Sequence, residues 1–215
     1  MAEGLATFAL VFAGCGAIVL ESERAGSLGS TGIAAGFGLV IMAMIYAVGH
    51  LSGAHINPAV SAAFTVTRHF PLRDAAAYIP SQLAGAVAAA ALLRIVWHGT
   101  PADLGATMPS VGVGSALIYE GVMTAFLMFV ILAVATDTRA VGEAAAIAIG
   151  GTIGLDAMFG GPISGASMNP MRSLGPGIVA GDLHAIWIYL LAPVAGTALG
   201  GLAYQFVRGS LDIDR

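Results

Sequence analysis

The strongest constraint on the fold is a seven-residue pattern that occurs twice in a very apolar chain. The first copy, 52–58, reads Ser-Gly-Ala-His-Ile-Asn-Pro, and the second, 164–170, reads Ser-Gly-Ala-Ser-Met-Asn-Pro, so each half of the 215 residues carries one copy. The chain is 58% hydrophobic and 9% charged, whereas soluble domains carry about a quarter charged residues. A large internal repeat in such a chain is typical of membrane proteins built from two related halves.

Composition also excludes several kinds of protein. A net charge of −4 argues against nucleic acid as a partner. Cys15 is the single cysteine, which rules out an internal disulfide and a cysteine-based metal site. The segment 11–15, Val-Phe-Ala-Gly-Cys, loosely resembles a lipoprotein cleavage site, but Glu3 stands where a basic region would be required, so we expect no cleavage.

Six stretches are apolar and long enough to cross a hydrocarbon core of ~30 Å. They are 1–20, 32–48, 74–97, 114–135, 143–159 and 184–207. Two further apolar stretches, 57–67 and 169–180, are too short to span, because a rise of ~1.5 Å per residue takes each about halfway. We therefore expect an all-α membrane protein with six transmembrane helices and two re-entrant half-helices that together complete one crossing.

The whole chain, 1–215, is predicted to be one domain made of repeats at about 1–97 and 114–207. Glu3 in the first span matches Glu120 in the fourth. Three spans in each repeat give the two repeats opposite orientations in the membrane. The arginines are uneven across this topology: Arg68, Arg73, Arg139, Arg208 and Arg215 fall on one side, and Arg24 and Arg94 on the other. The richer side is expected to be cytoplasmic, with both termini inside, in the plasma (cell inner) membrane.

Each Asn-Pro pair is suited to begin a helix inside the membrane. An asparagine caps the first turn, and proline suits the next position because its missing N–H has no partner there. If the helices after Asn57 and Asn169 meet at the midplane, both present the positive end of a helix dipole. Such a site donates hydrogen bonds to neutral solutes and repels cations.

These blocks make the chain similar to the major intrinsic protein, or aquaporin, family, along essentially its whole length. The resemblance implies six helices, two half-helices and a homotetramer with one pore per subunit, without metal or cofactor. It makes Asn57-Pro58-Ala59 the first pore motif. The second reads Asn169-Pro170-Met171, where Met171 either alters the packing between the half-helices or narrows the pore.

The same resemblance places an outer selectivity filter at Phe37, Ala157, Ala166 and Arg172. An arginine in a membrane-embedded half-helix is costly and usually functional. Water-selective members have histidine where this chain has Ala157, so the filter is expected to be wider and less polar than theirs.

Two kinds of wide-filter relative are candidates. Glycerol facilitators carry aspartate after the filter arginine, where this chain has Ser173. The segments 161–170 and 44–50 look closest to the nodulin-like intrinsic proteins of plants and their bacterial relatives, which pass undissociated metalloid acids. The expected function is a passive channel for water and small neutral solutes, including arsenious or boric acid and possibly glycerol or urea. A water-selective channel is the alternative.

The remaining polar residues at membrane depth are expected to be structural. Glu3 and Glu120 would bond to the backbone of the re-entrant loops, although a proton relay is the other interpretation. His50 is expected to be buried beside the first loop, with a proton site as the other interpretation. Asp156 is unexplained: it either faces loop backbone or adds negative charge near the outer mouth. Gly196 and Gly200 form a close-packing surface, within or between subunits.

Other classes fit less well. An ion-coupled secondary transporter would also have inverted repeats and broken helices, but the predicted cationic filter lacks an acidic ion site. An enzyme is not expected, because no serine–histidine, paired-aspartate or metal-ligand constellation appears at membrane depth.

Overall fold

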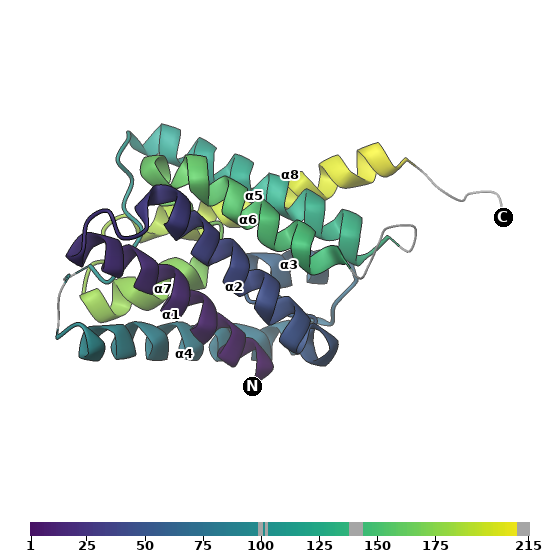
Figure 1. Ribbon diagram of the computed structural model, residues 1–215. Coiled ribbons are helices and arrows are strands. Elements are labelled where there is room, and N and C mark those ends of the chain that lie inside the picture. The colour runs from purple at the N-terminus through teal and green to yellow at the C-terminus, as the bar shows by residue number, and fades with distance from the viewer. Residues whose placement is uncertain (99–100, 102, 138–143, 210–215) are drawn as a thin grey trace.

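The computed structural model describes residues 1–98, 101, 103–137 and 144–209, and within them the chain is helical throughout, without strands (Figure 1). The described helices are α1 (Ala2–Glu23), α2 (Gly29–Ser52), α3 (Pro58–Val66), α4 (Leu72–Val96), α5 (Val113–Ala135), α6 (Ala145–Ser164), α7 (Pro170–Ala180) and α8 (Ile186–Arg208). Six of them, all but α3 and α7, are long and apolar enough to cross a membrane. The predicted membrane fold is confirmed.

The two short helices lie inside the bundle and enter it from opposite ends. In Figure 1, α3 occupies the right half of the interior and α7 the left half. Both begin at the predicted Asn-Pro pairs, with Asn57 and Asn169 as N-caps and the prolines in the first turn. The N-terminus and the end of α8 lie at the same end of the bundle (Figure 1), as an even number of crossings requires.

Two long helices run past their predicted ends. The prediction stopped the second and fifth spans at 48 and 159, whereas α2 continues to Ser52 and α6 to Ser164. Gly53 and Gly165 decide the true ends, because both adopt left-handed backbone (φ 79° and 91°) that glycine tolerates best. The predicted start of the fifth span at 143, and the basic residues Arg139 and Arg215, lie outside the described residues.

The helices pack in pairs that repeat between the two halves. Helix α1 packs on α4, and α5 packs on α8. A Cβ added to Gly85 of α4 would overlap the backbone of Gly4 in α1, and one added to Gly196 of α8 would lie 2.5 Å from the carbonyl oxygen of Gly121 in α5. Close backbone approach through small residues is the usual basis of helix association in lipid. The predicted close-packing surface at Gly196 therefore works within the chain.

A reciprocal glycine contact joins the two halves. Helix α2 of the first repeat packs on α6 of the second. A Cβ on Gly38 would lie 2.6 Å from the carbonyl oxygen of Gly150, and a Cβ on Gly150 would lie 2.6 Å from that of Gly38. The inverted repeat is thus visible in the packing as well as in the sequence.

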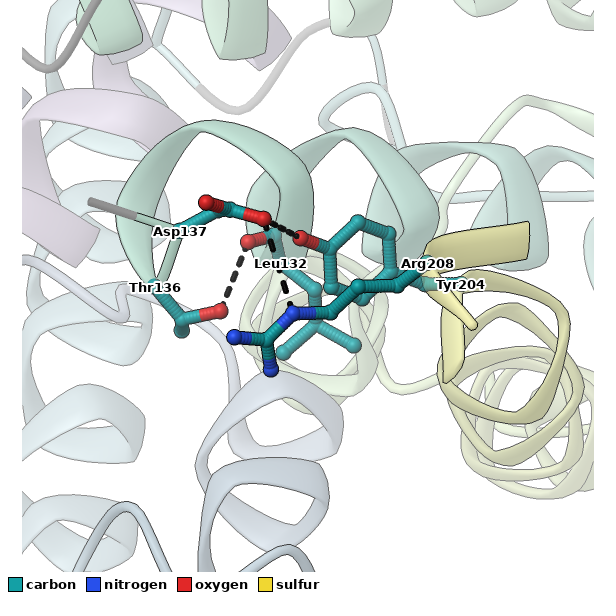
Figure 2. A network of polar contacts seen from close by, with 5 residues as sticks. All are labelled: Leu132, Thr136, Asp137, Tyr204 and Arg208. Atoms are coloured by element: carbon teal, nitrogen blue, oxygen red, sulfur yellow. Dashed lines mark hydrogen bonds and ion pairs between the residues drawn. The ribbon is translucent and has the colours of Figure 1, made fainter. Parts of the chain in front are cut away.

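A polar cluster ties α5 to α8 at one end of the bundle (Figure 2). The Tyr204 hydroxyl of α8 donates to the Asp137 carboxylate at 2.8 Å, and Arg208 Nε lies 3.5 Å from the same oxygen. Arg208 is 44% exposed, so its ion pair contributes little. The buried glycine contacts are expected to contribute more to the α5–α8 pairing.

The glycine packing predicts a sharp difference between two neighbouring residues of α8. A Cβ on Gly200 would lie 2.9 Å from the carbonyl carbon of Ala125 and nearer still to its oxygen, whereas a Cβ on Gly201 would have Leu132 Cδ1 at 3.8 Å as its nearest neighbour. Gly200→Ala should lower stability by about 1–3 kcal/mol, the usual cost of overpacking, and Gly201→Ala should not. Thermal unfolding in detergent, followed by size-exclusion chromatography, measures both, and equal melting temperatures would contradict the assignment.

Candidate pore and selectivity filter

The segment between α2 and α3 is held in an unusual backbone conformation. After Gly53, Ala54 and Ile56 have positive φ values of 47° and 55°. Non-glycine residues in this region each cost on the order of 1–3 kcal/mol and persist only when the surroundings enforce them. The segment between α6 and α7 repeats the pattern, with φ values of 42° at Ala166 and 53° at Met168.

A buried glutamate supports the first loop. The Glu3 carboxylate, 2% exposed, accepts hydrogen bonds from the backbone N–H groups of His55 at 2.9 Å and Ile56 at 2.7 Å. It also accepts from the Ser52 hydroxyl and from the Gln82 amide, both at 2.7 Å. These bonds satisfy loop N–H groups that lipid could not solvate.

Glu120 does the same for the second loop. It accepts from the backbone N–H groups of Ser167 at 2.9 Å and Met168 at 2.8 Å, and from the Ser164 hydroxyl at 2.7 Å. Each of these three contacts has a counterpart at Glu3. The fourth contact of Glu3, from Gln82, has no counterpart at Glu120 among the described residues. The structural interpretation of both glutamates, as supports for the loop backbone, fits these contacts.

Two tyrosines complete the supports, and sequence analysis did not assign them a role. The Tyr78 hydroxyl of α4 donates to the carbonyl oxygen of Ser52 at 2.8 Å, and the Tyr189 hydroxyl of α8 donates to that of Ser164 at 2.5 Å. Polar side chains are unusual in apolar spans and usually have a partner. Tyr78 and Gln82, one helical turn apart, were therefore a signal available in the sequence.

The two asparagines connect the half-helices to one another. Asn57 Oδ1 accepts from the N–H of Ala59 at 2.9 Å, and Asn169 Oδ1 accepts from that of Met171 at 3.0 Å. Asn57 Nδ2 donates to the carbonyl oxygen of Met168 at 2.7 Å, and Asn169 Nδ2 donates to that of Ile56 at 2.8 Å. Each amide thus caps its own helix and reaches the opposite repeat. Because an amide nitrogen carries two hydrogens, each keeps a second N–H.

A cavity runs along the meeting point of the half-helices. It is lined by both asparagines, by residues of both loops and, on the other sides, by aliphatic side chains such as Leu10, Ile41 and Val60. One wall is therefore polar and the rest of the lining is largely apolar. The four predicted filter residues, which come from different segments of the chain, line this same cavity: Phe37, Ala157, Ala166 and Arg172.

Arg172 is held firmly in the cavity wall. Its side chain is only 2% exposed. Nη1 donates to the carbonyl oxygen of Gly105 at 2.8 Å, and the guanidinium carbon lies 4.9 Å from the centre of the Phe37 ring. This distance is within the range of a cation–π contact. Among the described residues, Nε has no hydrogen-bond partner.

The structure separates two neighbours of Arg172 from the cavity. Met171 is buried, 4% exposed, in the hydrophobic core and is not among the residues that line the cavity. This placement favours the packing alternative for Met171 over the pore-narrowing one. The Ser173 hydroxyl accepts from Thr107 Oγ1 at 2.7 Å and pairs with Ser167 Oγ at 2.6 Å.

The expectation that His50 is buried was wrong, and Asp156 lies in surroundings that the sequence did not predict. His50 is exposed on the single chain, because the buried face of α2 contains Ile41 and Val48 and position 50 lies off this face. Asp156 is fully buried and not exposed at the outer mouth. Its carboxylate oxygens have no hydrogen-bond partner within the described part of the chain, so it does not bind loop backbone either.

Comparison with known proteins identifies the family. The family model "Major intrinsic protein" matches residues 1–204. Aquaporin NIP1-4 of Oryza sativa subsp. japonica is 51% identical over 208 residues, which are 97% of this chain and 76% of that protein. Nodulin-26 of Glycine max is 48% identical, with 97% and 77% covered. The X-ray structure of the aquaglyceroporin from Plasmodium falciparum superimposes with a TM-score of 0.83 at 27% identity and covers 94% of this chain and 93% of that one. With its six spans, paired half-helices and asparagine-lined cavity, this chain belongs to the major intrinsic protein family, and its relatives include nodulin-like aquaporins.

Proposed function

We propose that the protein is a passive membrane channel for water and small neutral hydroxylated solutes. The observation that carries the proposal is that both capping asparagines and Arg172 line one cavity. The relatives named as aquaporins, and the aquaglyceroporin with the same fold, support a channel that passes water and small solutes.

The cavity lining suits uncharged, hydroxylated molecules. The free N–H groups of Asn57 and Asn169 and the guanidinium of Arg172 donate hydrogen bonds to a hydroxyl oxygen. The aliphatic lining on the other sides accommodates the apolar surface of the solute. Two helix N-termini and a buried guanidinium oppose cations, including protons. A neutral solute with several hydroxyl groups, such as glycerol or undissociated boric or arsenious acid, matches this arrangement.

The proposed filter is wide because two of its four members are alanines. Ala157 and Ala166 each place only a methyl group at the cavity, which the larger Phe37 and Arg172 also line. We therefore propose that solutes larger than water pass, in preference to the alternative of a water-selective channel.

The proposal also covers orientation and assembly. Of the described arginines, Arg68, Arg73 and Arg208 fall on the predicted basic side, and Arg24 and Arg94 on the other. This excess supports cytoplasmic termini. A homotetramer in the plasma (cell inner) membrane is proposed from the family resemblance.

The function is tested by stopped-flow permeability of the purified protein in proteoliposomes. We expect flux of water and of at least one of glycerol, urea, boric acid and arsenite, linear in solute concentration and insensitive to ion gradients. Water flux without solute flux would establish the water-selective alternative. Saturable flux coupled to protons would identify a secondary transporter.

Ala157→His tests the proposed filter. An imidazole at this position would occupy part of the cavity, so solute flux should fall by about tenfold or more, as expected when a fitted site changes by a group of this size. Water flux should fall much less. The permeability ratio of solute to water measures the effect, and an equal loss of both would remove Ala157 from the filter. Ala157→Gly serves as the control, since it adds no atoms.

A further inference from the structure

The Phe37 ring occupies a notch in α1 that exists because residue 14 has no side chain. Gly14 is buried. A Cβ at this position would lie 2.6 Å from Cζ of the Phe37 ring and nearer still to Cδ1 and Cε1. Non-bonded carbon atoms normally stay about 3.5–4.0 Å apart. The ring therefore fills the space that a side chain at position 14 would take.

The same ring also lines the cavity. Phe37 is 6% exposed and lines the cavity beside Arg172. Because α1 lies on the notch side of the ring, a ring displaced from the notch moves away from α1, and the cavity and the Arg172 guanidinium are among its other neighbours. A phenyl ring is rigid and turns about two side-chain torsions, so it cannot absorb the overlap by bending.

The next residue of α1 supports a second member of the proposed filter. The backbone of Gly105 lies directly against Cys15, since a Cβ on Gly105 would be 3.2 Å from Cα of Cys15 and 3.1 Å from its carbonyl oxygen. The carbonyl oxygen of Gly105 accepts the hydrogen bond from Arg172 Nη1 at 2.8 Å. Two consecutive residues of α1 thus support the proposed filter. Gly14 leaves the space that the Phe37 ring fills, and Cys15 packs against Gly105, whose carbonyl group positions Arg172.

We propose that Gly14 is a specificity-determining residue of the channel. The depth of its notch sets how far the Phe37 ring reaches into the cavity, and so sets the size of the largest solute that passes. This proposal rests on the proposed function, because it requires that Phe37 form part of the filter. Gly14 itself does not line the cavity, so it acts only through the ring.

Gly14→Ala is the direct test. The added methyl group should push the ring toward the cavity and lower solute flux by about tenfold, the low end of what one methylene group changes in a fitted site, with water flux lowered about threefold at most. Gly36→Ala is the matched control: Gly36 precedes Phe37 in α2, and a Cβ there would meet only Ala17 Cβ at an ordinary 3.7 Å. Water, glycerol, urea and boric acid fluxes are measured in proteoliposomes for both variants and the unaltered protein.

A rescue variant separates the proposed role from general damage to helix packing. Phe37→Leu removes the ring, so Gly14→Ala combined with Phe37→Leu should conduct like Phe37→Leu alone. Equal loss of water and solute flux in Gly14→Ala, without rescue by Phe37→Leu, would overturn the proposal. If Gly14→Ala alone fails to fold, the double variant decides: folding with restored flux supports the notch, and failure to fold contradicts it.

The test also distinguishes the two proposals. If the unaltered protein passes water and none of the solutes, the wide filter is wrong. The role of Gly14 is then judged on water flux, which should fall in Gly14→Ala and recover in the double variant. If Gly14→Ala changes no flux in a folded channel, the notch does not set the width, whatever the substrate.

Discussion

The fold depends on satisfying backbone N–H groups of two irregular loops at membrane depth. Lipid offers no hydrogen bonds, so non-helical backbone survives there only when protein groups pair with it. Glu3 and Glu120 do this with carboxylate oxygens supplied from the first helix of each repeat. A hydrogen bond to a charged group contributes roughly 1.5–3 kcal/mol, so three or four of them can hold two strained residues per loop at a cost of about 1–3 kcal/mol each. Because the loops are held, the half-helices can begin at the midplane and the asparagines can face the cavity.

The fold also requires that neighbouring helices approach one another closely, and small residues make this approach possible. The α1–α4 and α5–α8 pairs meet through glycines, and α2 meets α6 through a reciprocal contact of Gly38 and Gly150. In a soluble protein, burial of large apolar side chains would drive the helices together. In lipid this driving force is missing, so van der Waals contact between closely packed backbones has to hold the helices together. The missing side chain at Gly14 has a different consequence, since the space left there is filled by the ring of Phe37 and not by another backbone.

Much of the candidate site could be predicted from particular residues. The half-helix starts at Asn57 and Asn169 follow from local capping chemistry, and Glu3 and Glu120 were recognisable as acids that need partners in lipid. The four proposed filter positions came from the family resemblance, and the structure brings them to one cavity. The wrong expectation was His50, whose burial depends on which face of α2 meets its neighbours. The role of Gly14 could not be predicted from the sequence, where it only forms part of a segment resembling a cleavage site. Its contact with Phe37 joins two different helices and depends on how they pack.

The sequence by itself determined the number of spans, the two half-length helices and the inverted repeat, because hydrophobic length and helix capping are local properties of the chain. The tertiary structure alone decided which side chains line the cavity and which stand behind it. Phe37, Ala157, Ala166 and Arg172 come from α2, α6, a loop and α7, so their meeting depends on how the helices pack. Packing also decided that Met171 is buried in the core while Arg172, the next residue, faces the cavity. The arrangement of the proposed filter is therefore a property of contacts between helices, which no single segment of the sequence contains.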